Sequence, residues 1–151
     1  MHRQTAGPAA PPPDVYRPLG EFRRALREFL AFSEAGARQH GLTSQQHQAL
    51  LAIKAHAGPG PMTVSQLADS LMIKTHSAVG LVARLVERGL LERRVSSADR
   101  RRVQLILQPE GEAALEGITQ ANLRQLESVA QILDELLQTA RRLQREAGRE
   151  S

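Results

Sequence analysis

The 151-residue sequence contains no cysteine and no tryptophan, and aromatic residues make up only 3% of it. The absence of cysteine excludes disulfide bonds, thiolate metal sites and redox sensing by a thiol within this chain. With so few aromatic residues, a core must be built from leucine, isoleucine, valine and alanine, which suit helix packing better than a β-sandwich. We therefore expect a mainly α-helical fold of ordinary domain size.

The sequence also lacks a run of about 18 apolar residues, the length that a membrane span requires. Its first residues, MHRQTAGPAAPPPD, contain no apolar segment of the signal-peptide type. We therefore expect a cytoplasmic protein. Residues 1–13 are rich in proline and alanine and have little to bury, so we expect a disordered tail there.

The residue combinations typical of an enzyme are missing as well. We find no nucleophile with a nearby base, no glycine-rich phosphate loop and no paired carboxylates in an apolar setting. His40 and His47 are seven residues apart across a predicted helix break, and no carboxylate completes a ligand set with them. We therefore expect no catalytic activity, no metal site and no cofactor.

Positive charge is concentrated in one stretch, residues 73–103. This stretch contains eight basic and three acidic residues, a net charge of +5, whereas the whole chain carries +4. The basic character is therefore local, as expected of a surface that binds a polyanion. Nearly all of it is arginine, whose guanidinium stays charged and binds phosphate in a fork-like geometry.

Within this stretch the pattern predicts a helix followed by a hairpin. Residues 76–88 form an amphipathic helix, in which Thr75 is the expected N-cap and Gly89 the residue that ends it. Its predicted apolar face contains Val79, Val82, Leu85 and Val86, and the remaining surface contains His76, Ser77, Gly80, Ala83 and Arg84. Alternating apolar residues on both sides of the polar run 96–102 predict a hairpin with a basic tip.

Three more helices are predicted before this stretch. The first covers about residues 15–39 and ends at Gly41, and its apolar positions fall at helical spacing. Residues 43–46 and 63–66 both have the form of a capping box, which predicts a helix start at each. The second of these helices is joined to the helix at 76–88 by a turn of only three residues, and together they form a helix-turn-helix. With the hairpin, residues 43–108 are predicted to be a winged helix-turn-helix lobe.

The C-terminal region is predicted to be helical over residues 109–147, starting at Pro109. Its apolar positions from Leu126 onward are three and four residues apart in alternation, the spacing of paired helices. The same pattern would also serve as a core stripe within the chain, but little chain is left to cover it, so we favour a homodimer. The predicted dimerisation lobe is 14–42 and 109–147, with contacts from Leu19, Leu126, Val129, Leu133, Leu136 and Leu143.

Taken together, these residues resemble the MarR family of bacterial winged-helix regulators. The resemblance is carried by TVSQLADSLMIKTHSAVGLVARLVERGLLERR, then SSADRR, then VQLILQPEGEAAL, within a region from about residue 15 to 145. It implies a homodimer that binds a pseudo-palindromic operator in double-stranded DNA, usually as a repressor. It also implies a small aromatic or phenolic effector that binds between the dimer lobe and the DNA lobe.

The resemblance also implies roles for individual residues. The expected recognition-helix contacts to DNA are Lys74, Thr75, His76, Ser77 and Arg84, and the expected wing contacts are Asp99, Arg100, Arg101 and Arg102. In this group we expect Arg101 to enter the minor groove while Asp99 holds it in place. Many family members carry a polar residue followed by arginine where this chain has Val79 and Gly80, so one base or phosphate contact of the family is missing here.

Other interpretations stay open at this point. A winged helix can serve protein contacts alone, although such a module would not need three arginines at the wing tip. His76 fits a DNA contact and a solvated helix-start residue equally well. An enzyme would need a convergent polar pocket, for which the sequence supplies no residues.

Overall fold

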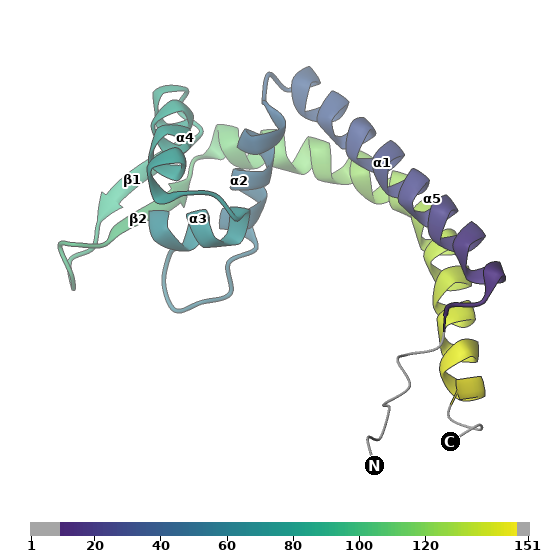
Figure 1. Cartoon of the computed structure of the whole chain (residues 1–151). Helices are drawn as coiled ribbons and strands as arrows, with labels where there is room; N and C mark the ends of the chain where they lie inside the picture. Colours follow the sequence, from purple (N-terminus) through teal and green to yellow (C-terminus); the bar gives the residue numbers. More distant parts are fainter. Residues whose placement is uncertain (1–9, 148–151) are drawn as a thin grey trace, which may run out of the picture. The chain divides into compact units, whose positions relative to one another are not determined.

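The computed structural model describes residues 10–147, which are mainly helical with one β-hairpin (Figure 1). After a short 3₁₀ helix at Pro13–Val15, the elements are α1 (Tyr16–Gln39), α2 (Ser44–Lys54), α3 (Val64–Leu71), α4 (Thr75–Glu87), β1 (Leu91–Val95), β2 (Val103–Leu107) and α5 (Pro109–Ala147). The predicted fold class, a winged helix-turn-helix with additional helices, is confirmed. Of the tail predicted at 1–13, residues 1–9 lie outside the described residues.

The chain divides into two compact units. One unit is Ala31–Leu123, which contains α2, α3, α4 and the hairpin. The other contains the part of α1 up to Leu30 and the part of α5 from Arg124 onward. The proposed division into a DNA-binding lobe and a dimerisation lobe stays a prediction.

Two of the helices in Ala31–Leu123 begin with a capping box, as the sequence predicts. The hydroxyl of Thr43 accepts from the backbone N–H of Gln46 at 3.1 Å, and the Gln46 side chain accepts from the Thr43 N–H at 3.0 Å. Thr63 and Gln66 repeat this arrangement at the start of α3. The start of α4 differs from the prediction. Its N-cap is Lys74, whose side chain makes no capping bond among the described residues, and Thr75 is the first helical residue.

Three helices end at a residue in the left-handed region of backbone space. Gly41 and Gly89, with φ of +69° and +70°, end α1 and α4 as predicted. Met72 ends α3 with φ of +54°, although a side chain disfavours this conformation. In each case the next residue donates its N–H back into the last turn, which satisfies a helix carbonyl. The left-handed residue at 72 makes the helix-turn-helix connection as short as the sequence predicts.

The core of Ala31–Leu123 is built mainly from leucine side chains of α2, α3, α4 and the hairpin. The largest fully buried side chains, to which α5 contributes Ile118, are Leu50, Leu67, Leu81, Leu85, Leu91, Leu105, Ile118 and Val82. The predicted buried face of α4 is partly wrong, because Ala78 and Leu81 are buried and Val79 is exposed. Positions 78, 81, 82 and 85 follow helical spacing, and the small Ala78 lets the helix lie close to its neighbours.

The hairpin is attached to the helical core along one edge. Its antiparallel register pairs Leu91 with Leu107 and Val95 with Val103. The segment before α3 pairs with β2 at one isolated antiparallel bridge, between Thr63 and Gln104, and the N–H of Leu105 donates to the carbonyl of Met62 at 2.8 Å. This pairing fixes the start of α3 beside the wing.

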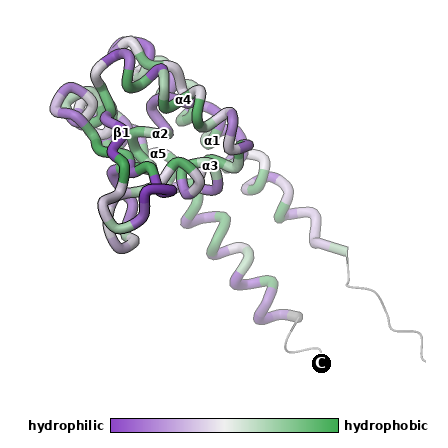
Figure 2. The backbone as a smooth tube through the Cα atoms, turned by 90° about the vertical axis from the view of Figure 1, so that its left-hand side faces the viewer, coloured by the Kyte–Doolittle hydropathy of each residue, from purple (hydrophilic) through white to green (hydrophobic). Residues whose placement is uncertain are grey.

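The unit formed by the outer parts of α1 and α5 has one covered and one exposed apolar stripe. Ala25 of α1 and Val129 of α5 are buried, and Arg142 of α5 donates to Asp14. Figure 2 shows hydrophobic and hydrophilic residues alternating along the C-terminal part of α5. The exposed large apolar residues of this unit are Tyr16, Leu19, Leu30, Leu126, Leu133 and Leu137. Of the predicted dimer contacts, Leu19, Leu126 and Leu133 are thus exposed, Leu136 and Leu143 are half-buried, and Val129 is covered by its own chain.

No helix within residues 10–147 is long and apolar enough to cross a membrane.

Candidate nucleic-acid interface

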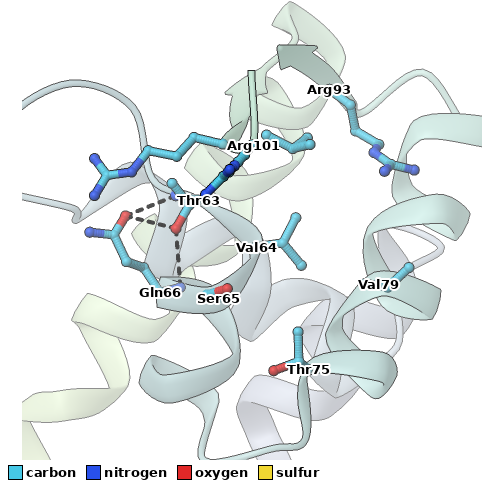
Figure 3. Close-up of a pocket in the computed structure, with 10 residues that line it drawn as sticks. Thr63, Val64, Ser65, Gln66, Thr75, Val79, Arg93 and Arg101 are labelled. Atoms are coloured by element: carbon cyan, nitrogen blue, oxygen red, sulfur yellow. Dashed lines mark hydrogen bonds between the residues drawn. The ribbon is translucent and has the colours of Figure 1, made fainter. Parts of the chain in front are cut away.

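A hollow of about 430 Å³ lies between the start of α3, α4 and the hairpin (Figure 3). We call it the basic hollow. Its lining residues are Thr63, Val64, Ser65, Gln66, Thr75, Val79, Arg93, Arg101, Arg102 and Val103. All of them belong to Ala31–Leu123. The helix-turn-helix and the wing therefore share one surface.

The basic hollow carries a concentrated positive charge. Arg93, Arg101 and Arg102 line it, and none of its ten described lining residues carries a carboxylate. All three arginines are exposed. Three guanidinium groups around one hollow, without a carboxylate among the lining side chains, favour the binding of phosphate groups.

Arg93 reaches this hollow because of the hairpin register. It pairs with Leu105, and residues directly opposite each other on antiparallel strands point to the same face. Leu105 is buried in the core beneath, so this face of the hairpin points toward the helices. The hairpin leaves the core toward its tip, so the longer Arg93 side chain ends in solvent. Neighbouring Glu92 and Arg94 lie on the opposite face and pair with each other at 3.2 Å.

Helix α4, the predicted recognition helix, presents mostly short side chains on its exposed face. Thr75, His76 and Ser77 are exposed in its first turn. One turn later Val79 is 42% exposed and lines the basic hollow beside Thr75. A Cβ built on Gly80 would have Nη1 of Arg84 as its nearest neighbour, at 3.6 Å. The helix surface at Gly80 is therefore open to an approaching ligand.

Asp99 organises the backbone of the wing tip. Its Oδ1 accepts from the N–H of Arg101 at 3.0 Å, and its Oδ2 lies 3.9 Å from Nε of Arg102. The hydroxyl of Ser96 accepts from the N–H groups of Ala98 and Asp99, at 3.3 Å each. These bonds hold the loop on which the arginines are mounted. The contact of Asp99 with Arg101 is thus to its backbone, and the side-chain pair is with Arg102.

The structure brings together some of the predicted DNA contacts and adds others. Thr75, Arg101 and Arg102 line the basic hollow. The remaining predicted contacts are exposed on α4, at its start or on the wing tip, namely Lys74, His76, Ser77, Arg84, Asp99 and Arg100. Seven lining residues were not among the predicted contacts: Thr63, Val64, Ser65, Gln66, Val79, Arg93 and Val103. The position of Arg93 could have been inferred from the sequence, because its two-residue spacing from Leu91 places both side chains on the same face of the predicted strand.

Residues 10–147 contain no group of three or more His, Asp or Glu side chains placed to hold a metal ion.

Comparisons with known proteins agree with this geometry. A model of the MarR family matches residues 40–102, the helix-turn-helix and most of the wing. No curated protein matches the sequence. Among solved structures, a MarR family transcription regulator is 25% identical with a TM-score of 0.68, and the match covers 91% of this chain and 95% of that chain.

Two further solved structures are similar in fold. MepR of S. aureus in complex with DNA is 22% identical, with a TM-score of 0.66 and coverage of 84% of this chain and 93% of that chain. CouR from Rhodococcus jostii bound to p-coumaroyl-CoA is 19% identical, with a TM-score of 0.62 and coverage of 83% and 93%. Residues 40–102 of this chain thus match the MarR family, and the chain shares the fold of MarR family transcription regulators.

Proposed function

We propose that this protein is a homodimeric repressor that binds a pseudo-palindromic operator and is released by a small aromatic effector. The single observation that carries the DNA-binding part is the basic hollow, which is lined by three arginines beside the exposed face of α4. Phosphate contacts from such arginines position a protein on the duplex, and side chains of α4 contact base edges in the major groove. As a regulator of chromosomal genes, it would act in the cytoplasm.

The wing supplies a second contact to the duplex. Arg101 is mounted on the loop that Asp99 holds through its backbone N–H. A narrow, A/T-rich minor groove has an enhanced negative potential that attracts an inserted guanidinium. In this proposal Arg101 enters that groove, while Arg93 and Arg102 hold the phosphates between the two grooves.

The homodimer is supported by the exposed apolar residues on α1 and α5. Leu126, Leu133 and Leu137 are exposed on one helix, and Leu19 and Leu30 are exposed on the other. Large apolar patches on a soluble protein mark interaction sites. A second copy of the chain would cover them, and its two-fold symmetry would place two recognition helices in major grooves about 34 Å apart.

The effector class is taken from proteins of similar fold. CouR is bound to p-coumaroyl-CoA, and the DNA binding of BpsR from Bordetella bronchiseptica is regulated by 6-hydroxynicotinic acid. Both molecules contain an aromatic ring with a hydroxyl group. A thermal-shift screen of small aromatic acids tests this part, because a ligand that binds only the folded state raises the melting temperature.

The DNA-binding part is tested by selecting duplexes from a random library with the full chain. We expect an enriched pseudo-palindrome with half-sites about 10 bp apart. Enrichment of single half-sites alone would contradict the symmetric dimer. If no sequence is enriched and retention on duplex DNA does not depend on salt, the DNA-binding function itself is wrong, and a protein-binding module becomes the better interpretation.

A further inference from the structure

The recognition helix α4 has few side chains that can form paired hydrogen bonds with a base. Arg84 and Glu87 are its only long polar side chains, and Arg84 lies in the last turn. Bidentate contacts from arginine to guanine, or from asparagine or glutamine to adenine, need such side chains near the centre of the groove. Between Thr75 and Ala83 the exposed positions other than His76 are short or apolar. An apolar contact is therefore expected to add to the hydrogen bonds that the polar side chains of this helix can make to bases.

Val79 is the exposed apolar side chain on this face. It is 42% exposed, and it lines the basic hollow one helical turn after Thr75. The core face of α4 is already complete without it, because Ala78, Leu81 and Val82 are buried. Figure 3 shows Val79 and Thr75 on the same side of α4, next to the hollow. An exposed valine here is a ready apolar contact for whatever lies against the helix.

Thymine offers the matching group in the major groove. Its C5-methyl is the apolar feature of the base edges there, and apolar side chains contact it. We propose that Val79 is a specificity-determining residue that recognises the methyl group of a thymine in each operator half-site. The neighbouring Gly80 favours this contact, since it adds no Cβ to the helix surface and lets the base edge approach. This inference rests on the proposed DNA binding.

The test removes the C5-methyl group of thymine from one side of the contact and the two methyl groups of Val79 from the other. A duplex enriched from the random library is rebuilt with uracil in place of thymine, one symmetric pair of positions at a time. Uracil differs from thymine only by the C5-methyl group, and base pairing is preserved. Affinities are measured by fluorescence anisotropy for the wild-type chain, Val79→Ala and Val86→Ala. Val86 is half-buried on the core side of α4, so Val86→Ala is a matched control for loss of a valine from the same helix.

The expected result is one symmetric thymine pair at which uracil weakens wild-type binding. The loss should be about fourfold per half-site, the factor that corresponds to burial of one methyl group. Val79→Ala should bind the thymine and uracil duplexes equally well, while Val86→Ala should still discriminate between them.

Two results would overturn the inference while leaving the proposed function intact: selective binding that no uracil substitution weakens, or discrimination that persists in Val79→Ala. The second result would assign the thymine contact to another residue, such as Thr75. A failure to enrich any sequence would overturn both the inference and the proposed DNA binding, so the two failures are distinguishable.

Discussion

Replacing Gly80 by alanine should make the protein more stable and its DNA complex weaker. Gly80 lies in the interior of α4, where glycine costs about 1 kcal/mol relative to alanine. The added Cβ would meet only Nη1 of Arg84, at 3.6 Å, which is an ordinary van der Waals contact. No packing within Ala31–Leu123 therefore requires a glycine at this position. The remaining reason for it is the close approach of a ligand.

Both magnitudes follow from this geometry. A gain of about 1 kcal/mol in the free energy of unfolding corresponds to a rise in melting temperature of about 2 to 4 °C for a chain of this size. Overpacking a close interface by one methyl group costs about 1 to 3 kcal/mol, or roughly 5- to 150-fold in Kd. The two effects have opposite signs, so a general loss of structure cannot produce them together.

The assay combines thermal melts without DNA and anisotropy titrations with the selected duplex. Ala83→Gly is the control, because it makes the reverse change at an exposed position of the same helix. It should lower the free energy of unfolding by about 1 kcal/mol. If Gly80→Ala lowers the melting temperature, the glycine has a packing role in the folded chain, and the expected gain in stability is refuted. If it raises the melting temperature and leaves the affinity unchanged, Gly80 does not lie at the closest approach to DNA.

Three further predictions concern the dimer, the core and the wing. Leu133 is 36% exposed on α5, so Leu133→Asp should give a folded monomer by light scattering, and a persistent dimer would refute the proposed interface. Burial lowers the pKa of His47, so the unfolded chain binds more protons below its ordinary pKa of about 6.5. The contribution of neutral His47 to the free energy of unfolding should therefore be complete above that pH and decrease at lower pH, by at most about 1.4 kcal/mol per pH unit. In urea titrations at several pH values, His47→Leu should make the free energy of unfolding less dependent on pH. Arg101→Ala should cost about 1 to 3 kcal/mol on operators with A/T-rich flanks and less on G/C-rich ones, and equal losses on both would leave Arg101 as a phosphate contact only.

Local signals in the sequence predicted most of the elements and their ends. Thr43 and Thr63 begin helices because their capping boxes satisfy backbone N–H groups that would otherwise have no partner. Gly41 and Gly89 end helices because the left-handed conformation costs glycine little. These effects depend on a few adjacent residues, so one sequence is enough to predict them.

Tertiary packing decides which apolar face of a helix is buried, and the spacing of apolar residues was not sufficient to predict it. The spacing of Val79, Val82 and Val86 predicted that Val79 lies on the buried face of α4, whereas the core contains Ala78. On α5 the predicted stripe combined Val129, which is buried, with Leu126 and Leu133, which are exposed. Two stripes at similar spacing share this helix, and periodicity does not say which one packs within the chain.

The basic hollow could be predicted only in part. The charge of residues 73–103 indicated a polyanion surface, and Arg101 and Arg102 were among its expected contacts. Ser65 and Gln66 belong to it because the pairing of Thr63 with Gln104 fixes the start of α3 beside the hairpin. Such long-range pairing has no local signal in the sequence.

The most direct test of the DNA-binding surface is the salt dependence of operator affinity when arginines of the basic hollow are removed. For the wild-type chain, we expect the affinity to fall by about 10³ to 10⁵ between 50 and 200 mM salt, as for a protein with 6 to 10 phosphate contacts. The double variant Arg93→Ala, Arg102→Ala should bind more weakly at 50 mM salt. The slope of log affinity against log salt concentration should become smaller by about two per subunit, one for each phosphate contact removed. Arg38→Ala, which removes an arginine paired with Glu34 on α1, should leave the slope unchanged. An equal slope for the wild type and the double variant would contradict the assignment of the basic hollow as the surface that binds DNA.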